Sequence, residues 1–175
     1  MKTIKRAMVM VLALLALAVQ ANAWEMYGGV RDTDTLSQAA ARLSKQGLSC
    51  DSRFVGHIEN HPELKYKSWS REAENSDRIV VVNVYYVGDD VVGVLAQNMY
   101  KDSQLAGGYY SKAQGRLAKK YGTPNLSEED SGLYWISGKN IVKLASQSHR
   151  SDSGIVTFDV TVAYYTFRMS KIIFE

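Results

Sequence analysis

Cysteine, proline and histidine are scarce in this chain. Its 175 residues include one cysteine, two prolines and three histidines. A single cysteine cannot form a disulfide within the chain, so the sequence excludes a small scaffold stabilised by disulfides. After residue 23 no apolar run approaches the roughly 20 residues that a membrane-spanning helix needs. We therefore expect a chain that does not span a membrane after residue 23 and that folds around an ordinary apolar core.

The first 23 residues have the pattern of a secretory signal peptide. A basic start at residues 2–6 is followed by an apolar run at 7–19 and by Ala-Asn-Ala at 21–23, which fits the small-residue cleavage site of such peptides. The competing interpretation, a transmembrane anchor, requires a longer apolar run. The cysteine, Cys50, lies far downstream, so no lipid-attachment cysteine follows the run. We expect cleavage after residue 23 and a location in the periplasm or outside the cell.

The positive net charge of the whole chain comes from its first 23 residues and does not indicate an anionic partner. The formal net charge is +3 at pH 7, but residues 2–6 contribute three of the 21 basic residues and residues 1–23 contain no acidic one. Residues 24–175 therefore carry 18 basic and 18 acidic side chains, on a length that suits a single domain. Nucleic-acid binders usually have a basic excess. We expect neither nucleic acid nor an anionic membrane surface as a partner.

The first half of residues 24–175 has clear signals for one helix and several strands. An amphipathic helix is predicted to begin after Asp34 or Thr35 and to end at Gly47, with apolar residues at helical spacing between them. Strands are expected around 49–55 and 64–69. A β-hairpin is predicted around the Gly-Asp-Asp turn at 88–90.

The stretch YYSKAQGRLAKKYGTPN, residues 109–125, predicts a second amphipathic helix that ends at Gly122, with Pro124 beyond it. We interpret this helix as part of the core. Strands are predicted at 133–137 and 141–148, and the run 155–167 alternates apolar with polar residues, as an antiparallel strand with one wet face does. The fold class that follows is α+β, an antiparallel sheet of about six to eight strands with two helices packed on one face.

The two predicted helices resemble each other. The segments SQAAARLSKQG (37–47) and SKAQGRLAKKYG (111–122) share Ser, Ala, Arg, Leu and Lys at matching positions, and strands follow each of them. This indicates a duplicated helix-then-sheet unit at 35–100 and 107–175 within the single domain 24–175. The alternative is chance, because amphipathic helices drawn from Ala, Leu, Lys and Arg often match.

Three segments carry a resemblance to known proteins: Leu117–Pro124, then Tyr134-Trp135, then Ile141–Leu144. The pattern resembles small exported bacterial envelope proteins of an uncharacterised family, in which a helix ending K-Y-G-x-P leads into an antiparallel sheet that carries a Trp. It is also similar to the helix-plus-sheet modules of outer-membrane assembly lipoproteins and of secreted β-lactamase inhibitor proteins. The resemblance implies an envelope or secreted setting and no catalytic residue.

A metal site is the first chemistry to consider, because His57, Glu59 and His61 lie close together in GHIENHP. The zinc protease motif places its glutamate directly after the first histidine, whereas here the glutamate comes one position later. Pro62 also moves His61 away from helical geometry, and His149 is the one other histidine. We interpret the segment as a polar surface loop and predict no metal and no cofactor.

Signatures of catalysis are missing as well. The sequence has no G-x-S-x-G elbow and no phosphate-binding loop. We interpret Cys50 as a small buried hydrophobe at the start of a strand, and the alternatives are a reactive thiol or an intermolecular disulfide. No catalytic residue is predicted. A non-enzymatic binding module is favoured, with a small envelope hydrolase of dispersed catalytic residues and a carrier of apolar ligands as alternatives.

The candidate binding surface is the sheet face opposite the predicted helices. The alternation in the last strand places Asp159, Thr161 and Tyr165 on that face, and the hairpin strand adds Asn83 and Tyr85. Aromatic anchors mixed with short polar groups suit a protein or peptide partner. We therefore predict an exported binding module that recognises an unidentified protein or peptide of the cell envelope through these five residues.

Overall fold

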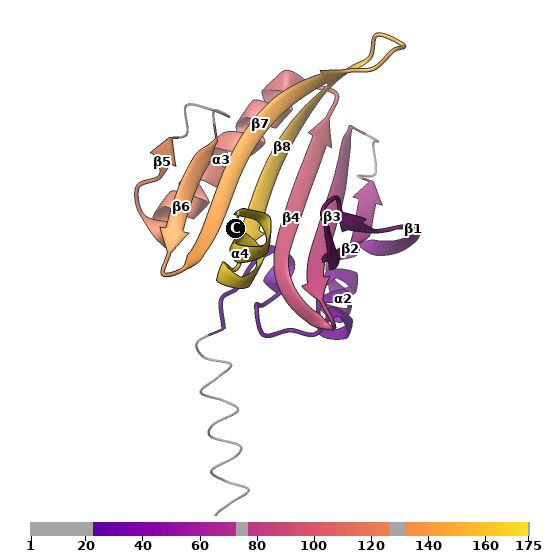
Figure 1. The fold of residues 1–175 in the computed structure, drawn as a ribbon. Coiled ribbons are helices and arrows are strands. Elements are labelled where there is room, and N and C mark those ends of the chain that lie inside the picture. Colours follow the sequence, from indigo (N-terminus) through magenta and orange to yellow (C-terminus); the bar gives the residue numbers. More distant parts are fainter. Residues whose placement is uncertain (1–22, 73–76, 127–131, 175) are drawn as a thin grey trace, which may run out of the picture.

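The structure, a computed structural model, describes residues 23–72, 77–126 and 132–174. The predicted signal peptide therefore lies outside the described residues, apart from its last alanine. Eight strands form one sheet in the order β1-β2-β3-β4-β8-β7-β6-β5, and every neighbouring pair is antiparallel (Figure 1). The predicted α+β class with an antiparallel sheet is confirmed.

The elements follow each other in a repeated order. The strands are β1 (Ser49–Ile58), β2 (His61–Glu72), β3 (Arg78–Val87), β4 (Asp90–Tyr100), β5 (Asn125–Leu126), β6 (Leu133–Ser137), β7 (Asn140–Arg150) and β8 (Val156–Tyr165). The helices are η1 (Tyr27–Gly29), α2 (Leu36–Lys45), α3 (Ser103–Tyr121) and α4 (Phe167–Phe174). A helix followed by four strands thus occurs twice, and β4 pairs with β8 to join the halves. The duplication of the sequence itself stays a prediction.

Helix α2 begins at a capping box. The Thr35 hydroxyl accepts a hydrogen bond from the Gln38 backbone N–H at 3.3 Å, and the Gln38 side chain accepts one from the Thr35 backbone N–H at 2.9 Å. One turn further on, Ala39 and Leu43 are fully buried. They belong to an apolar cluster with side chains of the sheet, among them Trp69, Val80, Val82 and Val84.

Helix α3 is longer than the sequence predicted. It begins after Asp102, whose carboxylate accepts hydrogen bonds from the backbone N–H groups of Gln104 at 2.7 Å and Leu105 at 2.8 Å. It ends where predicted, at Gly122 with a φ of 86°. The indole N–H of Trp135 donates to the Gly122 carbonyl at 2.9 Å, so the helix end and the tryptophan of β6 are directly linked.

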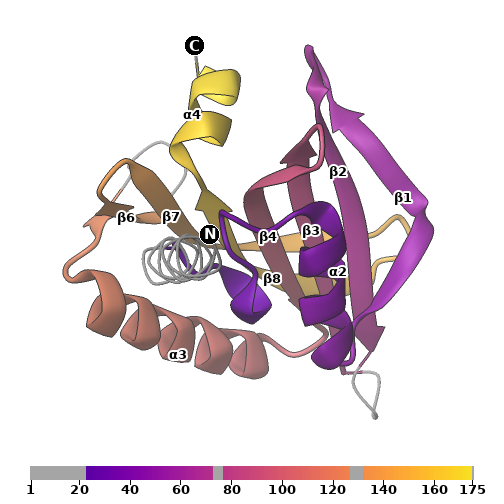
Figure 2. The same cartoon turned by 90° about the horizontal axis from the view of Figure 1, so that it is seen from below.

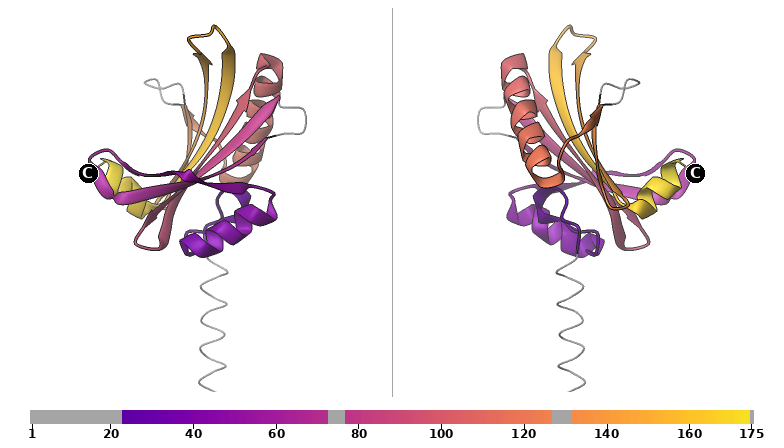
Figure 3. Two further views of the ribbon diagram at one scale, coloured as in Figure 1. Left: turned by 90° about the vertical axis from the view of Figure 1, so that its right-hand side faces the viewer. Right: turned by 90° about the vertical axis from the view of Figure 1, so that its left-hand side faces the viewer.

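Helices α2 and α3 pack against the same face of the sheet. Val82 on β3 pairs with Ala96 on β4, which pairs with Val162 on β8, which pairs with Leu144 on β7. All four side chains are buried, and they extend from the cluster under α2 to the cluster under α3. Figures 2 and 3 show the two helices on one side of the curved sheet and α4 on the other.

The third α-helix, α4, was not predicted, and it lies on the face opposite α2 and α3. The predicted strand 155–167 ends at Tyr165 because Thr166 caps α4. The Thr166 hydroxyl donates to the Val92 carbonyl at 2.6 Å and accepts from the Met169 backbone N–H at 3.3 Å. Met169 is buried in a third cluster with Val92.

The length and apolar character of the helices in the described ranges decide whether one of them could cross a membrane. None of them combines the length and the apolar character that crossing a bilayer requires.

Candidate functional site

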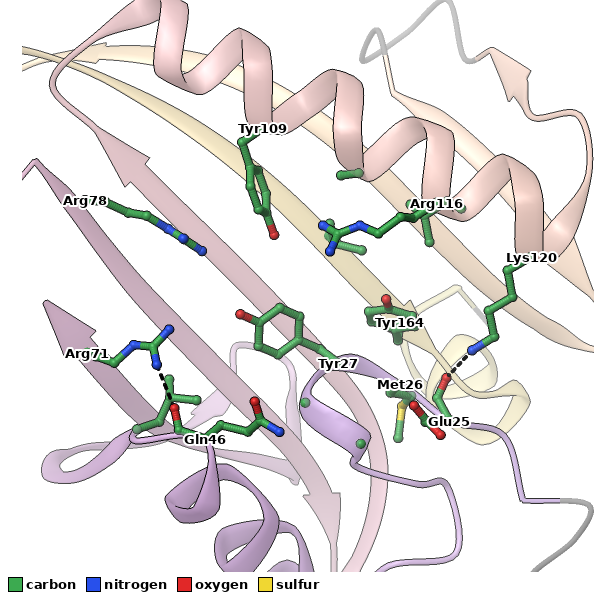
Figure 4. A pocket seen from close by; sticks show the side chains of 16 residues that line it. Glu25, Met26, Tyr27, Gln46, Arg71, Arg78, Tyr109, Arg116, Lys120 and Tyr164 are labelled. Atoms are coloured by element: carbon green, nitrogen blue, oxygen red, sulfur yellow. Dashed lines mark hydrogen bonds between the residues drawn. The ribbon is translucent and has the colours of Figure 1, made fainter. Parts of the chain in front are cut away.

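A cleft of about 470 Å³ lies between η1 and α3, over the sheet face that the helices cover. Its walls carry four cationic side chains, from Arg71, Arg78, Arg116 and Lys120, and one acidic side chain, from Glu25. Three tyrosines, Tyr27, Tyr109 and Tyr164, contribute rings to the same cleft. Figure 4 shows how these side chains lie around Tyr27.

Arg78 has a fixed position in this cleft. Its Nε donates to the Asn98 side-chain oxygen at 3.1 Å, and Nη2 donates to the same oxygen. Asn98 is fully buried. The guanidinium carbon also lies 5.2 Å from the ring centre of Tyr109 and 5.8 Å from that of Tyr100, which is cation–π distance. These partners orient Arg78 without neutralising its charge.

Asn98 also sets the hydrogen-bonding role of Tyr109. The amide nitrogen of Asn98 donates to the Tyr109 hydroxyl oxygen at 3.2 Å. A tyrosine hydroxyl has one hydrogen to donate in addition to the oxygen that accepts. Because the oxygen is used by Asn98, the hydrogen remains available for an acceptor bound in the cleft. The Tyr109 ring also packs against the apolar cluster under α3.

The other three cations contact neutral groups. Arg71 Nη1 donates to the backbone carbonyl of Gln46 at 2.7 Å, and Lys120 Nζ donates to that of Glu25 at 3.2 Å. The guanidinium carbon of Arg116 lies 5.9 Å from the Tyr109 ring centre. The ion pairs of the described residues involve other cations. Within that part of the chain, the positive charge of the cleft is therefore not balanced by paired carboxylates.

Two tyrosines of the cleft, Tyr27 and Tyr164, are neutral hydrogen-bonding groups at physiological pH. Burial raises the pKa of Tyr27, and the nearby guanidinium groups of Arg78, Arg71 and Arg116 oppose that rise only in part. Burial likewise raises the pKa of Tyr164, again with Arg116 acting in the opposite direction. Figure 4 shows the three arginines around the Tyr27 ring.

A glycine turn places Tyr27 in the cleft. Gly28 and Gly29 have φ values of 67° and 76°, a region that residues with a side chain seldom adopt. A Cβ atom added at Gly28 would lie 3.0 Å from Leu43 Cδ2. The Met26 backbone N–H donates to the Val30 carbonyl at 2.7 Å, which closes the turn. No function was predicted for this segment from the sequence, although two consecutive glycines after a tyrosine could have indicated a tight turn.

Comparisons with known proteins were made for the whole chain. No family model, curated protein or solved structure matches it. The chemistry of the cleft is therefore the basis for a functional proposal, because a fold alone does not determine function.

The five residues predicted as a binding surface lie on the opposite face of the sheet. Tyr85 pairs with Gly93, which pairs with Tyr165. Asn83 is the next position of that face on β3, and Thr161 lies on the same face of β8 beyond Ala163. Both are partly exposed. The structure thus brings four of the five onto an accessible face, away from the cationic cleft. Their role in binding stays a prediction.

Asp159 corrects that prediction. It is on the expected face, but its exposed fraction is only 2%. One carboxylate oxygen accepts from the Gln97 amide at 2.7 Å and lies 3.2 Å from His149 Nε2. The strand β8 is central in the sheet, with β4 and β7 as neighbours. Side chains from both neighbours cover Asp159, so it cannot be a contact residue of an open surface.

The predicted tyrosine anchors are less exposed than the alternation suggested. Tyr85 and Tyr165 pack against the apolar cluster that includes Met169 of α4. Burial, together with the neighbouring hydroxyls of Tyr165 and Tyr66, raises the pKa of Tyr85 to about 12. Helix α4 therefore covers the end of the face where these two tyrosines lie.

A second cavity of about 540 Å³ is present on this same face, over β1, β2 and β3. Asn83 and Tyr85 line it together with apolar side chains such as Ile79 and Val81. It shares no lining residue with the cationic cleft.

The interpretation of Cys50 as buried is wrong, because Cys50 is exposed. It lies on β1, an edge strand with a neighbour on one side only. The segment GHIENHP is also not a loop, since only residues 59 and 60 form a turn, where Asn60 has a φ of 68°. Within the described residues, no three His, Cys, Asp or Glu side chains gather closely enough to hold a metal ion.

Proposed function

We propose that the protein is an exported, non-enzymatic binding module of the bacterial envelope, periplasmic or secreted, and that it binds an anionic ligand or an anionic group of a partner in the cationic cleft. The observation that carries this proposal is the convergence of three arginines and a lysine on one cavity, without a paired carboxylate among the described residues. The net charge of residues 24–175 is zero, so this concentration of positive charge is local.

Arginine suits the recognition of carboxylates and related anions. Its planar guanidinium presents several N–H donors, and hydrogen bonds between charged partners contribute roughly 1.5–3 kcal/mol each. Arg78 is already oriented by Asn98 and by the ring of Tyr109. A side chain fixed before binding loses less conformational entropy when the ligand arrives.

Export is supported by the sequence pattern of residues 1–23 and by one contact of the next residue. The backbone nitrogen of Trp24 donates to a carboxylate oxygen of Asp32 at 2.8 Å. Cleavage after residue 23 would turn this nitrogen into an α-amino group, which is mostly protonated near neutral pH. The new N-terminus would then form an ion pair with Asp32.

We expect the exported protein to begin at Trp24. Intact-mass measurement of the protein recovered from the periplasm or the culture medium, after expression of the full chain in a bacterium, checks this. A membrane-bound product that retains Met1 would contradict export.

Substitution of Arg78 by glutamine is expected to weaken binding of a polyanion by about tenfold, because a charge-assisted hydrogen bond is lost. The probe is pyranine, a fluorescent aromatic trisulfonate, and the measurement is fluorescence anisotropy at low salt. The matched control is Lys119→Gln, which removes a positive charge from α3 outside the cleft. Failure of the wild-type protein to bind pyranine, or equal binding by Arg78→Gln, would contradict the proposed site.

The alternatives differ in their support. The apolar-carrier alternative is favoured by the second cavity, whose walls include Ile79 and Val81. The hydrolase alternative needs dispersed catalytic residues to gather in a cleft, and neither of these two cavities is lined by Cys50, His57 or His61.

A further inference from the structure

The cations of the cleft come from two separate walls. Arg71 and Arg78 belong to the strands β2 and β3, whereas Arg116 and Lys120 belong to α3. Figure 4 shows the two groups on opposite sides of Tyr27, with the Tyr109 ring above it. An anionic group in contact with one wall therefore leaves the other wall's cations without a ligand.

The strand wall, which carries Arg71 and Arg78, cannot easily move toward the helix wall, which carries Arg116 and Lys120. Arg78 is bound to the buried Asn98, and Arg71 is bound to the Gln46 carbonyl at the end of α2. The backbone of the helix wall is also fixed, because Ala113 and Leu117 of α3 are buried against the sheet. A single small anion could reach both walls only through movement of the exposed Arg116 and Lys120 side chains.

The space between the walls is suited to a ring. The phenol of Tyr27 lies there, and the Tyr109 hydroxyl has a hydrogen to donate. Tyrosine rings offer flat apolar faces beside a polar edge. The cavity, at about 470 Å³, is in the size range of sites for small organic molecules rather than for an inorganic ion.

Resting on the proposed function, we infer that the ligand carries two anionic groups, one on each side of an aromatic or sugar ring. One group contacts Arg71 and Arg78, and the other contacts Arg116 and Lys120. The ring packs between Tyr27 and Tyr109. A dianion of this kind balances more of the cleft's charge than a monoanion can, and it does so without displacing Asn98 or Gln46 from their arginines.

The test compares dicarboxylates with matched monocarboxylates as competitors of bound pyranine. Isophthalate, terephthalate and 2,6-naphthalenedicarboxylate differ in the separation of their two carboxylates, and benzoate and 2-naphthoate are their one-carboxylate counterparts. At least one dicarboxylate is expected to bind about tenfold tighter than its counterpart, since it gains a second charge-assisted contact. Inorganic phosphate is the control for a single dianionic group.

Variants of each wall complete the test. Arg78→Gln and Arg116→Gln are each expected to reduce the affinity of the preferred dicarboxylate to that of its monocarboxylate. Lys119→Gln is expected to leave the ratio unchanged. If pyranine binds but every dicarboxylate equals its counterpart, or if phosphate binds tighter than all of them, the two-ended ligand is wrong while the anionic cleft stands. If pyranine does not bind, the proposed function itself fails.

Discussion

Replacement of Leu117 by alanine is expected to lower the free energy of unfolding by about 2–5 kcal/mol. Leu117 is 6% exposed and lies in the apolar cluster under α3, together with Trp135 and Val162. The loss combines the transfer of the removed carbon atoms to water with the cavity that remains beneath the helix. Urea denaturation followed by circular dichroism measures the change.

A matched control for this change is available on the same helix. Leu105 is 53% exposed, so Leu105→Ala is expected to change stability by no more than about 0.5 kcal/mol. A loss of less than about half a kcal/mol for Leu117→Ala would mean that this helix face is in solvent. In that case α3 would not pack against the sheet through Leu117, and the cleft would lack the wall that carries Arg116.

Replacement of Gly93 by alanine is expected to destabilise the fold by about 1–3 kcal/mol, because an added methyl group has no room. A Cβ atom at Gly93 would lie 2.1 Å from Met169 Sδ and 2.9 Å from the Tyr164 carbonyl oxygen. The sulfur belongs to a flexible side chain, but the carbonyl is backbone within the sheet. Either α4 is displaced or the pairing of β4 with β8 is disturbed, and thermal denaturation measures the result.

The same glycine-to-alanine substitution in helix α3 is expected to have the opposite effect on the free energy of unfolding. A Cβ atom at Gly107 in α3 would meet nothing within 4 Å. Alanine favours a helix interior by roughly 0.5–1 kcal/mol over glycine, so Gly107→Ala is expected to stabilise the protein. If both substitutions shift stability equally, the close approach of α4 to Gly93 is not the cause.

Local signals in the sequence predicted α2, the second part of α3 and most strands, because the contacts responsible for them are also local. The cap of α2 involves Thr35 and Gln38, three residues apart, and the stop of α3 involves Gly122 itself. The hairpin at 88–90 is confirmed by the pairing of Val87 with Asp90 and by the positive φ of Gly88. Such interactions are formed by neighbours in the chain, so residue type and spacing predict them.

The start of α3 and the existence of α4 were missed for a different reason. Residues 103–108 include two glycines, which disfavour a helix by propensity, yet Asp102 caps the helix and Ala106 is buried. Thr166 interrupts an apolar pattern that continues past it, and its hydroxyl donates to Val92, 74 residues away. Packing and capping by distant groups outweighed the local pattern.

The cationic cleft could not be predicted because its parts are far apart in the chain. Tyr27 follows the predicted cleavage site, Arg78 begins β3, and Arg116 lies on α3. Arg71 and Arg78 stand beside acidic residues in the sequence, Arg116 stands near two lysines, and the overall charge of residues 24–175 is zero. The sequence did indicate that residues 109–125 form a core helix, and Leu117 is buried, but Tyr109 and Arg116 of that helix line the cleft.

By itself the sequence determined the class of the fold, an antiparallel sheet with helices. The reason is that the spacing of apolar residues, alternating in strands and helical in helices, indicates which side chains are buried. It also determined the turns, where glycines with positive φ are needed. Only the tertiary structure decided which faces the helices cover, that Asp159 is buried and Cys50 exposed, and that four cations share one cavity. The physical reason is that burial and electrostatic environment depend on the order of strands in the sheet, and that order is set by contacts between residues distant in the chain.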